Sequence, residues 1–132
     1  MKHFFKIIIV ASLLSTATLV NAAPAVGTWT MQFWGDSLTL YQNYDICIQS
    51  SGDWYISTSS IHGWKGKWFS KGNNTYFQTL HSSGTAAMSS DVSRINDSLL
   101  TGYHKFINNT GTNDYYTMSI TYKKSTCDPY AP

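Results

Sequence analysis

Apolar and polar residues alternate along most of this chain, and this period-two pattern limits its possible folds more than any other feature. In residues 27–34 the apolar side chains of Trp29, Met31 and Phe33 occupy every second position. Residues 115–124 repeat the pattern, with an inward face made of Tyr116, Met118, Ile120 and Tyr122. Successive side chains of a β-strand point to opposite faces, so alternation of this kind is typical of half-buried strands. No window carries the 3.6-residue apolar period of an amphipathic helix. The pattern therefore predicts an all-β domain.

Clusters of Gly, Asn, Asp and Ser divide the chain into eight expected strands. These strands cover residues 27–34, 38–49, 54–59, 64–69, 75–80, 91–95, 98–107 and 115–124. Their regular spacing predicts an antiparallel eight-stranded up-and-down meander. Such a meander removes its edges by closing into a barrel, and a two-sheet sandwich is the alternative arrangement. The stretch His81–Ser90 has the weakest pattern and is expected to be a loop or a single helical turn.

The two cysteines, Cys47 and Cys127, predict one disulfide. An isolated pair in a chain that reaches an oxidising compartment forms a single bridge most simply. In the second expected strand one face carries Leu38, Leu40, Tyr44, Ile46 and Ile48, which places Cys47 on the other. The bridge is therefore expected to join this strand to the C-terminal tail outside the core. The closed loop spans 80 residues, for which the chain-entropy model gives about 4 kcal/mol of stabilisation.

The first 22 residues have the pattern of a secretory signal. Lys2 and Lys6 precede an apolar run at residues 7–14, and cleavage is expected after Ala22. The run is shorter than the roughly 20 residues of a membrane span, so no span is expected after processing. Residues 23–132 are then a single domain that is secreted or periplasmic.

The charge and the motifs of the processed chain exclude several classes of function. Without Lys2 and Lys6, seven of the nine basic residues remain, against seven acidic residues that are all Asp. This balance does not favour a nucleic-acid partner. No nucleophile elbow, phosphate loop or dinucleotide motif occurs, so we expect neither an enzyme nor a cofactor. The spacing of His62, His81 and His104 matches no compact zinc motif, so no metal is expected.

The segment Gly27-Thr28-Trp29, at the start of the first of eight strands, resembles the opening of the calycins, which include lipocalins, fatty-acid-binding proteins and avidins. The motif covers three residues, while the architecture could cover residues 27–124. The resemblance implies a barrel that holds a small, often apolar ligand in its mouth. It also implies that Trp29 packs across the closed end, where Lys123 or Lys124 could stack on it. The residue pattern with which avidins contact biotin is not recognisable.

Aromatic residues make up 15% of the chain, and all five tryptophans lie between Trp29 and Trp68. Flat rings with nearby polar groups can form a ligand platform. The same rings can instead fill the core of a small domain that has few leucines. The candidate ligand-binding residues are Trp34, Trp54, Trp64, Trp68 and Tyr76.

These features together predict a secreted, non-catalytic binding protein. The expected ligand is a small apolar or sugar-like molecule, such as part of a glycan, held on aromatic residues. The alternative is a periplasmic enzyme inhibitor or interaction module that binds a partner protein through a loop. That loop would be His81–Ser90 or the connection Ile61–Gly63.

Overall fold

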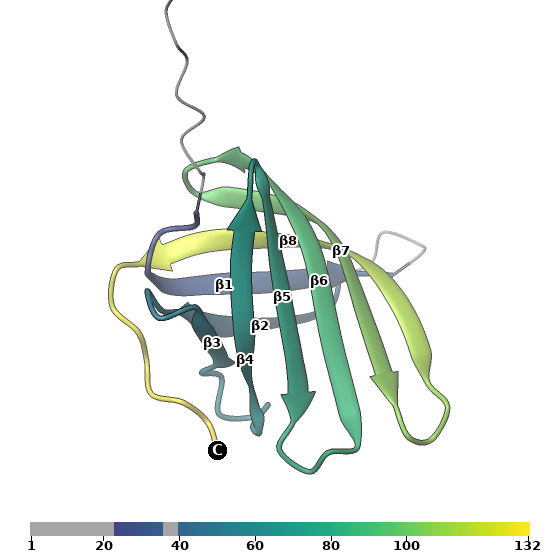
Figure 1. The fold of residues 1–132 in the computed structure, drawn as a ribbon. Helices are drawn as coiled ribbons and strands as arrows, with labels where there is room; N and C mark the ends of the chain where they lie inside the picture. Colours follow the sequence, from purple (N-terminus) through teal and green to yellow (C-terminus); the bar gives the residue numbers. More distant parts are fainter. Residues whose placement is uncertain (1–22, 36–39) are drawn as a thin grey trace, which may run out of the picture.

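The computed structural model describes residues 23–35 and 40–132 and contains eight strands there (Figure 1). The expected signal peptide, residues 1–22, and the expected start of the second strand at residue 38 lie outside the described residues. The strands are β1 (Gly27–Trp34), β2 (Leu40–Ile48), β3 (Asp53–Ile56), β4 (Trp64–Lys71), β5 (Asn74–His81), β6 (Ala86–Asn96), β7 (Leu99–Asn108) and β8 (Asn113–Lys124).

The eight strands form an antiparallel meander that closes into a barrel. Each strand pairs with the next along the chain, and β1 pairs with β8 to complete the circle. In Figure 1, β5, β6 and β7 run side by side along the near wall, and β1 and β8 cross behind them. Closure gives every strand a partner on both sides. The predicted barrel is confirmed, and the sandwich alternative is wrong.

The inward face of each strand builds one core, as the alternation predicts. Trp29, Met31 and Phe33 are buried on β1, and Met118 and Ile120 are buried on β8. Inward-facing residues of the other strands complete the same cluster. The barrel interior is thus packed with side chains over much of its length, which is typical of eight-stranded barrels.

The prediction of a loop or helical turn at His81–Ser90 is wrong for most of this segment. Strand β5 continues to His81, and β6 begins at Ala86 and pairs with both of its neighbours. Met88 and Ser90 face the interior while Ser89 faces outward. Small residues on both faces hide the alternation in the sequence, but backbone hydrogen bonds to two strands hold this segment extended.

Leu40 does not share the buried face of Tyr44, Ile46 and Ile48, in contrast to the expectation. The pairing of β1 with β2 is irregular at this point: Phe33 pairs with Gln42, but Trp34 pairs with Leu40. The additional residue on β2 is a β-bulge, which reverses the alternation beyond it. Leu40 therefore lies outside with Trp34 and is 45% exposed.

The N-terminal segment and Trp29 close one end of the barrel. The indole nitrogen of Trp29 donates a hydrogen bond to the carbonyl of Ala25 at 2.9 Å, and its ring meets Tyr122 edge-on at 5.1 Å. The lysines that the resemblance placed on this ring have other partners. Lys123 forms an ion pair with Asp45, and Lys124 forms one with Asp128. The predicted structural role of Trp29 is consistent with these contacts, and the two lysine ammonium groups are paired with carboxylates.

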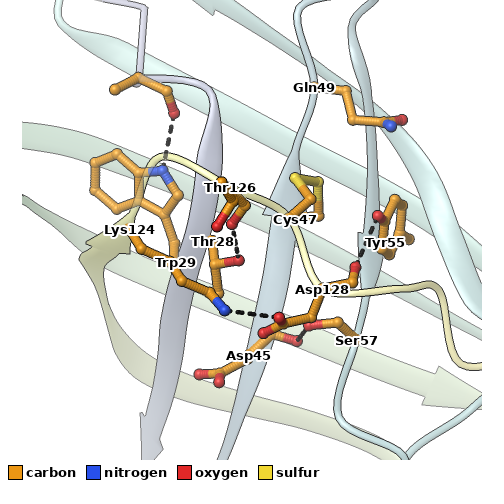
Figure 2. Close-up of a disulfide and its surroundings, with 12 residues drawn as sticks. Thr28, Trp29, Asp45, Cys47, Gln49, Tyr55, Ser57, Lys124, Thr126 and Asp128 are labelled. Carbon is orange, nitrogen blue, oxygen red and sulfur yellow. Dashed lines mark hydrogen bonds and ion pairs between the residues drawn. A yellow bond between two sulfur atoms is a disulfide. The ribbon is translucent and has the colours of Figure 1, made fainter.

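The C-terminal tail crosses the outside of the barrel and is attached by the predicted disulfide between Cys47 and Cys127 (Figure 2). Cys47 is fully buried between strand and tail. Two hydrogen bonds hold the tail on either side of the bridge. Thr28 donates to the carbonyl of Thr126 at 2.6 Å, and the hydroxyl of Tyr55 donates to the carbonyl of Asp128 at 2.9 Å. A disulfide of this kind is typical of proteins that fold in an oxidising compartment.

Candidate ligand-binding cavity

A cavity of about 490 Å³ lies among the side chains at the end of the barrel opposite Trp29. Its volume is within the range of small-molecule sites. Most strands contribute to it, because their inward residues converge there. The lining residues are Phe33, Gln42, Tyr44, Ile61, Trp64, Met88, His104, Phe106, Asn108, Thr112, Asp114 and Tyr116.

The inner wall of the cavity is formed by aromatic rings from β1, β2, β4, β7 and β8. The ring of Phe33 lies 5.2 Å from that of Tyr44 and 6.3 Å from that of Tyr116. On the other side, Trp64 lies 6.1 Å from Phe106. These centroid distances are typical of packed aromatic pairs. The rings therefore support one another and hold the wall in a defined shape.

The side chain of Ile61, in the connection between β3 and β4, forms part of the mouth. The C-terminal tail holds this connection in place. The amide of Gly63 donates to the carbonyl of Ala131 at 3.0 Å, and the amide of Ala131 donates to the carbonyl of Ile56 at 3.3 Å. Gly63 is buried, so this connection packs against the barrel and does not project from it. The disulfide-linked tail thus shapes one side of the mouth.

His104 places a polar group within the aromatic wall. Its side chain is 5% exposed and packs on Phe33, with 4.3 Å between the ring centroids. Its Nδ1 atom shares a hydrogen bond of 2.8 Å with the hydroxyl of Ser90. Burial lowers the pKa of His104 from 6.5 to about 4, because desolvation disfavours the imidazolium form. At neutral pH the cavity therefore contains an uncharged imidazole.

The shifted pKa of His104 predicts a loss of stability in acid. The unfolded chain binds a proton as the pH falls through 6.5, but the native imidazole does not until about pH 4. The native state therefore loses stability across this window. Between pH 7 and pH 4.5, we expect the free energy of unfolding of the wild type to fall about 2 kcal/mol more than that of His104→Gln. Urea unfolding at the two pH values measures this difference, and equal losses would contradict the assigned pKa.

Tyr44 adds a second buried polar group. Its hydroxyl donates to the sulfur of Met88 at 3.4 Å, and burial raises the pKa of this phenol well above its ordinary value of 10. Tyr44 is therefore neutral at every physiological pH. Like His104, it contributes polarity without charge.

Polar side chains from β8 and the neighbouring turn form the rim. The hydroxyl of Tyr116 donates to Oδ2 of Asp114 at 3.1 Å. The carbonyl oxygen of the Asn108 side chain accepts the backbone amides of Thr110 and Thr112 at 3.1 and 3.0 Å. This Asx-type turn fixes the connection between β7 and β8, which forms one side of the cavity mouth.

Of the five candidate residues from the sequence, the structure brings only Trp64 to the cavity. Trp54 lies in the core and is 2% exposed. Trp68 is half-buried beside the core, and its indole donates to the carbonyl of Gln49 at 2.9 Å. Tyr76 is on the outer face, stacked on Phe69 at 4.9 Å, and Trp34 also faces outward, paired with Leu40. The five side chains therefore do not form one platform.

The remaining lining residues were not among the sequence candidates. Phe33 and Tyr116 had been predicted to face the interior, but nothing in the sequence separates a cavity wall from a packed core. His104, Phe106 and Asp114 lie in a part of the chain with no tryptophan, outside the segment 34–76 that contains the five candidates. The alternation of residues 98–107 was the one sequence feature that could have placed His104 and Phe106 on the inward face.

Of the three histidines His62, His81 and His104, the structure brings the first two near each other and places the third apart. His81 contacts Trp64, and its ring nitrogens lie 2.6 Å from the Ser83 hydroxyl and 3.2 Å from the His62 carbonyl. His104 lies inside the barrel. Across residues 23–35 and 40–132, no group of three or more His, Cys, Asp or Glu side chains is arranged to hold a metal ion.

Comparisons of the chain with models of known protein families, with curated proteins and with solved structures gave no significant match. Within the described residues, no helix is long and apolar enough to cross a membrane.

Proposed function

We propose that this protein is a secreted, non-catalytic binding protein that holds a small, largely apolar ligand in the mouth of its barrel. The aromatic cavity opposite Trp29 is the observation that carries this proposal. Rings and the thioether of Met88 would supply apolar contact, and His104 with the polar rim would orient the ligand. Deep pockets with a few directed polar groups are the usual form of small-molecule sites.

The disulfide and the charge balance support the proposed secreted or periplasmic location. Cys47 and Cys127 form a bridge whose loop spans 80 residues, which suits a secretory or periplasmic compartment. The neutral balance of the processed chain favours neither nucleic acid nor an anionic membrane surface. The loop-based alternative has less support, because Ala86–Ser90 belongs to β6 and Gly63 is buried.

A variant that blocks the mouth tests the proposal. Thr112 lines the cavity at its rim, whereas Thr110, two residues earlier, is exposed and does not line it. We expect Thr112→Trp to weaken binding of N-phenyl-1-naphthylamine, an apolar probe that is uncharged at neutral pH, by about tenfold or more, because the indole would occupy its space. Thr110→Trp should change the affinity by less than about twofold. Fluorescence titration of the probe measures both.

Equal probe affinities of Thr112→Trp and Thr110→Trp would show that the probe binds outside the cavity. Absence of probe binding to the wild type would count against the cavity as a binding site. Native mass spectrometry of the protein recovered from its secretory compartment complements this test. A retained mass of a few hundred daltons, lost in Thr112→Trp, would identify the ligand class. A protein partner retained in its place would favour the interaction-module alternative.

A further inference from the structure

The charges that line the cavity have one sign. Among the described residues that line the cavity, Asp114 is the only acidic one, and none is lysine or arginine. The hydroxyl of Tyr116 donates a hydrogen bond to Oδ2 of this carboxylate. Its Oδ1 atom has no hydrogen-bond partner among the described residues. The rim therefore presents one carboxylate oxygen that is available to a donor on a ligand.

The neighbouring basic groups are held away from the cavity. Lys105 is adjacent to Phe106 on β7, but its ammonium group lies outside the barrel over the ring of Tyr115, at 5.1 Å. Lys65 is adjacent to Trp64 and lies over the ring of Tyr130, at 5.7 Å. Both lysines alternate with cavity residues and so face outward. No lysine side chain therefore neutralises Asp114 from these two strands.

The uncharged polar groups inside the cavity do not neutralise the negative charge of Asp114 either. His104 is a neutral imidazole at pH 7 because burial lowers its pKa to about 4. When its proton lies on Nδ1, toward Ser90, its Nε2 atom can accept a hydrogen bond from a ligand. The inner site thus holds no positive charge, and in this tautomer it offers an acceptor.

Five aromatic residues line the same cavity as this carboxylate: Phe33, Tyr44, Trp64, Phe106 and Tyr116. The face of an aromatic ring attracts a cation, and cages of rings recognise organic ammonium groups in this way. A carboxylate at the edge of such a cage adds a charged hydrogen-bond acceptor. An anionic ligand such as a fatty acid would instead meet Asp114 without a cation to pair with it.

From this combination we infer that the cavity selects an organic ammonium ion, a ligand with one positive charge on an apolar body. The inference rests on the proposed function and specifies its ligand class. The ammonium group would lie near Asp114 and Tyr116, where it can donate to the carboxylate. The apolar body would extend inward along Phe33 and Phe106 toward Met88.

Three probes that share one apolar body isolate the effect of ligand charge. 4-Phenylbutylamine, 4-phenylbutanol and 4-phenylbutyrate carry charges of plus one, zero and minus one at pH 7. Isothermal titration calorimetry on residues 23–132 with the disulfide intact should show the amine binding at least about tenfold more tightly than the alcohol, with the carboxylate weakest. The preference for the amine should fall as salt is raised, because the rim is solvent-accessible.

Asp114→Asn removes the charge but keeps an oxygen that can accept the Tyr116 hydroxyl. We expect this variant to bind the amine about tenfold more weakly and the alcohol unchanged. Asp91→Asn is the matched control, because Asp91 is exposed on β6 and does not line the cavity. It makes the same change in net charge and should leave all three affinities unchanged. Thermal unfolding of both variants checks that they remain folded.

The outcomes separate this inference from the proposed function. Equal binding of amine and alcohol, or an unchanged amine affinity in Asp114→Asn, would overturn the ammonium inference while the cavity remains a binding site. Binding of N-phenyl-1-naphthylamine without measurable binding of the amine would overturn it in the same way. If neither that probe nor any of the three phenylbutyl compounds binds, the proposed function itself fails.

Discussion

Replacing both Cys47 and Cys127 with alanine is expected to lower the free energy of unfolding by about 4 kcal/mol. The bridge closes a loop of 80 residues, and a cross-link of that length removes much of the conformational entropy of the unfolded chain. Most contacts of the tail do not depend on the sulfurs. The bonds from Thr28 to Thr126 and from Tyr55 to Asp128 could still form in the variant. The effect should therefore come mainly from the unfolded state.

Urea unfolding followed by tryptophan fluorescence measures this loss at pH 7. Wild-type protein treated with a thiol reductant should unfold at the same urea concentration as the double variant. Deletion of residues 129–132, which keeps the bridge, is the control for the end of the tail. This deletion removes the bonds of Ala131 to Gly63 and Ile56 but leaves the 80-residue loop closed. A double variant within about 1 kcal/mol of the wild type would show that the loop does not constrain the unfolded chain.

Trp54→Ala should destabilise the protein by about 3–5 kcal/mol, the range for removing a large buried aromatic side chain. Trp54 is 2% exposed and meets Phe77 edge-on at 5.6 Å. Its indole nitrogen lies 3.1 Å from the carbonyl of Lys67 and 3.2 Å from that of Gln78. The substitution removes these bonds and leaves a cavity between β3, β4 and β5. Ligand affinity should not depend on this residue directly, because it does not line the barrel mouth.

Trp34→Ala provides the matched control, since Trp34 is only half-buried and faces outward. Its effect should be about 1 kcal/mol or less. Trp54→Phe keeps most of the ring but loses the donor, so a loss of about 1–3 kcal/mol is expected. This variant gives a measurable result even if Trp54→Ala fails to fold. Similar unfolding free energies for Trp54→Ala and Trp34→Ala would falsify the assignment of Trp54 to the core.

The sequence predicted the strands most accurately where the two faces differ strongly in polarity. β1 begins and ends at the predicted residues, Gly27 and Trp34, and the inward face of β8 carries the predicted apolar side chains. β6 was predicted poorly, because Ala86, Ala87, Ser89 and Ser90 give its two faces nearly the same polarity. There, hydrogen bonding to β5 and β7 determines the structure in place of local propensity.

The disulfide could also be predicted, for a simple reason. With two cysteines only one intramolecular pair is possible, and alternation placed Cys47 on the outer face of its strand. The bulge at Leu40 could not be predicted in this way. It depends on how β2 pairs with β1 next to Trp34, and such a register is a property of two strands together.

The sequence by itself therefore determined the all-β class, the inward faces of most strands and the cysteine pair, because each follows from local alternation or from elimination. The location of the cavity was decided only by the tertiary structure. Inward residues at the two ends of a barrel look alike in the sequence, and Trp29 fills one end while Trp64 lines the cavity at the other. Pairing of β7 with β8 places His104 near Asp114, and closure of β1 onto β8 then adds Phe33 from the other end of the chain. Their common cavity, and the unbalanced charge of Asp114 within it, exist only once the barrel has closed.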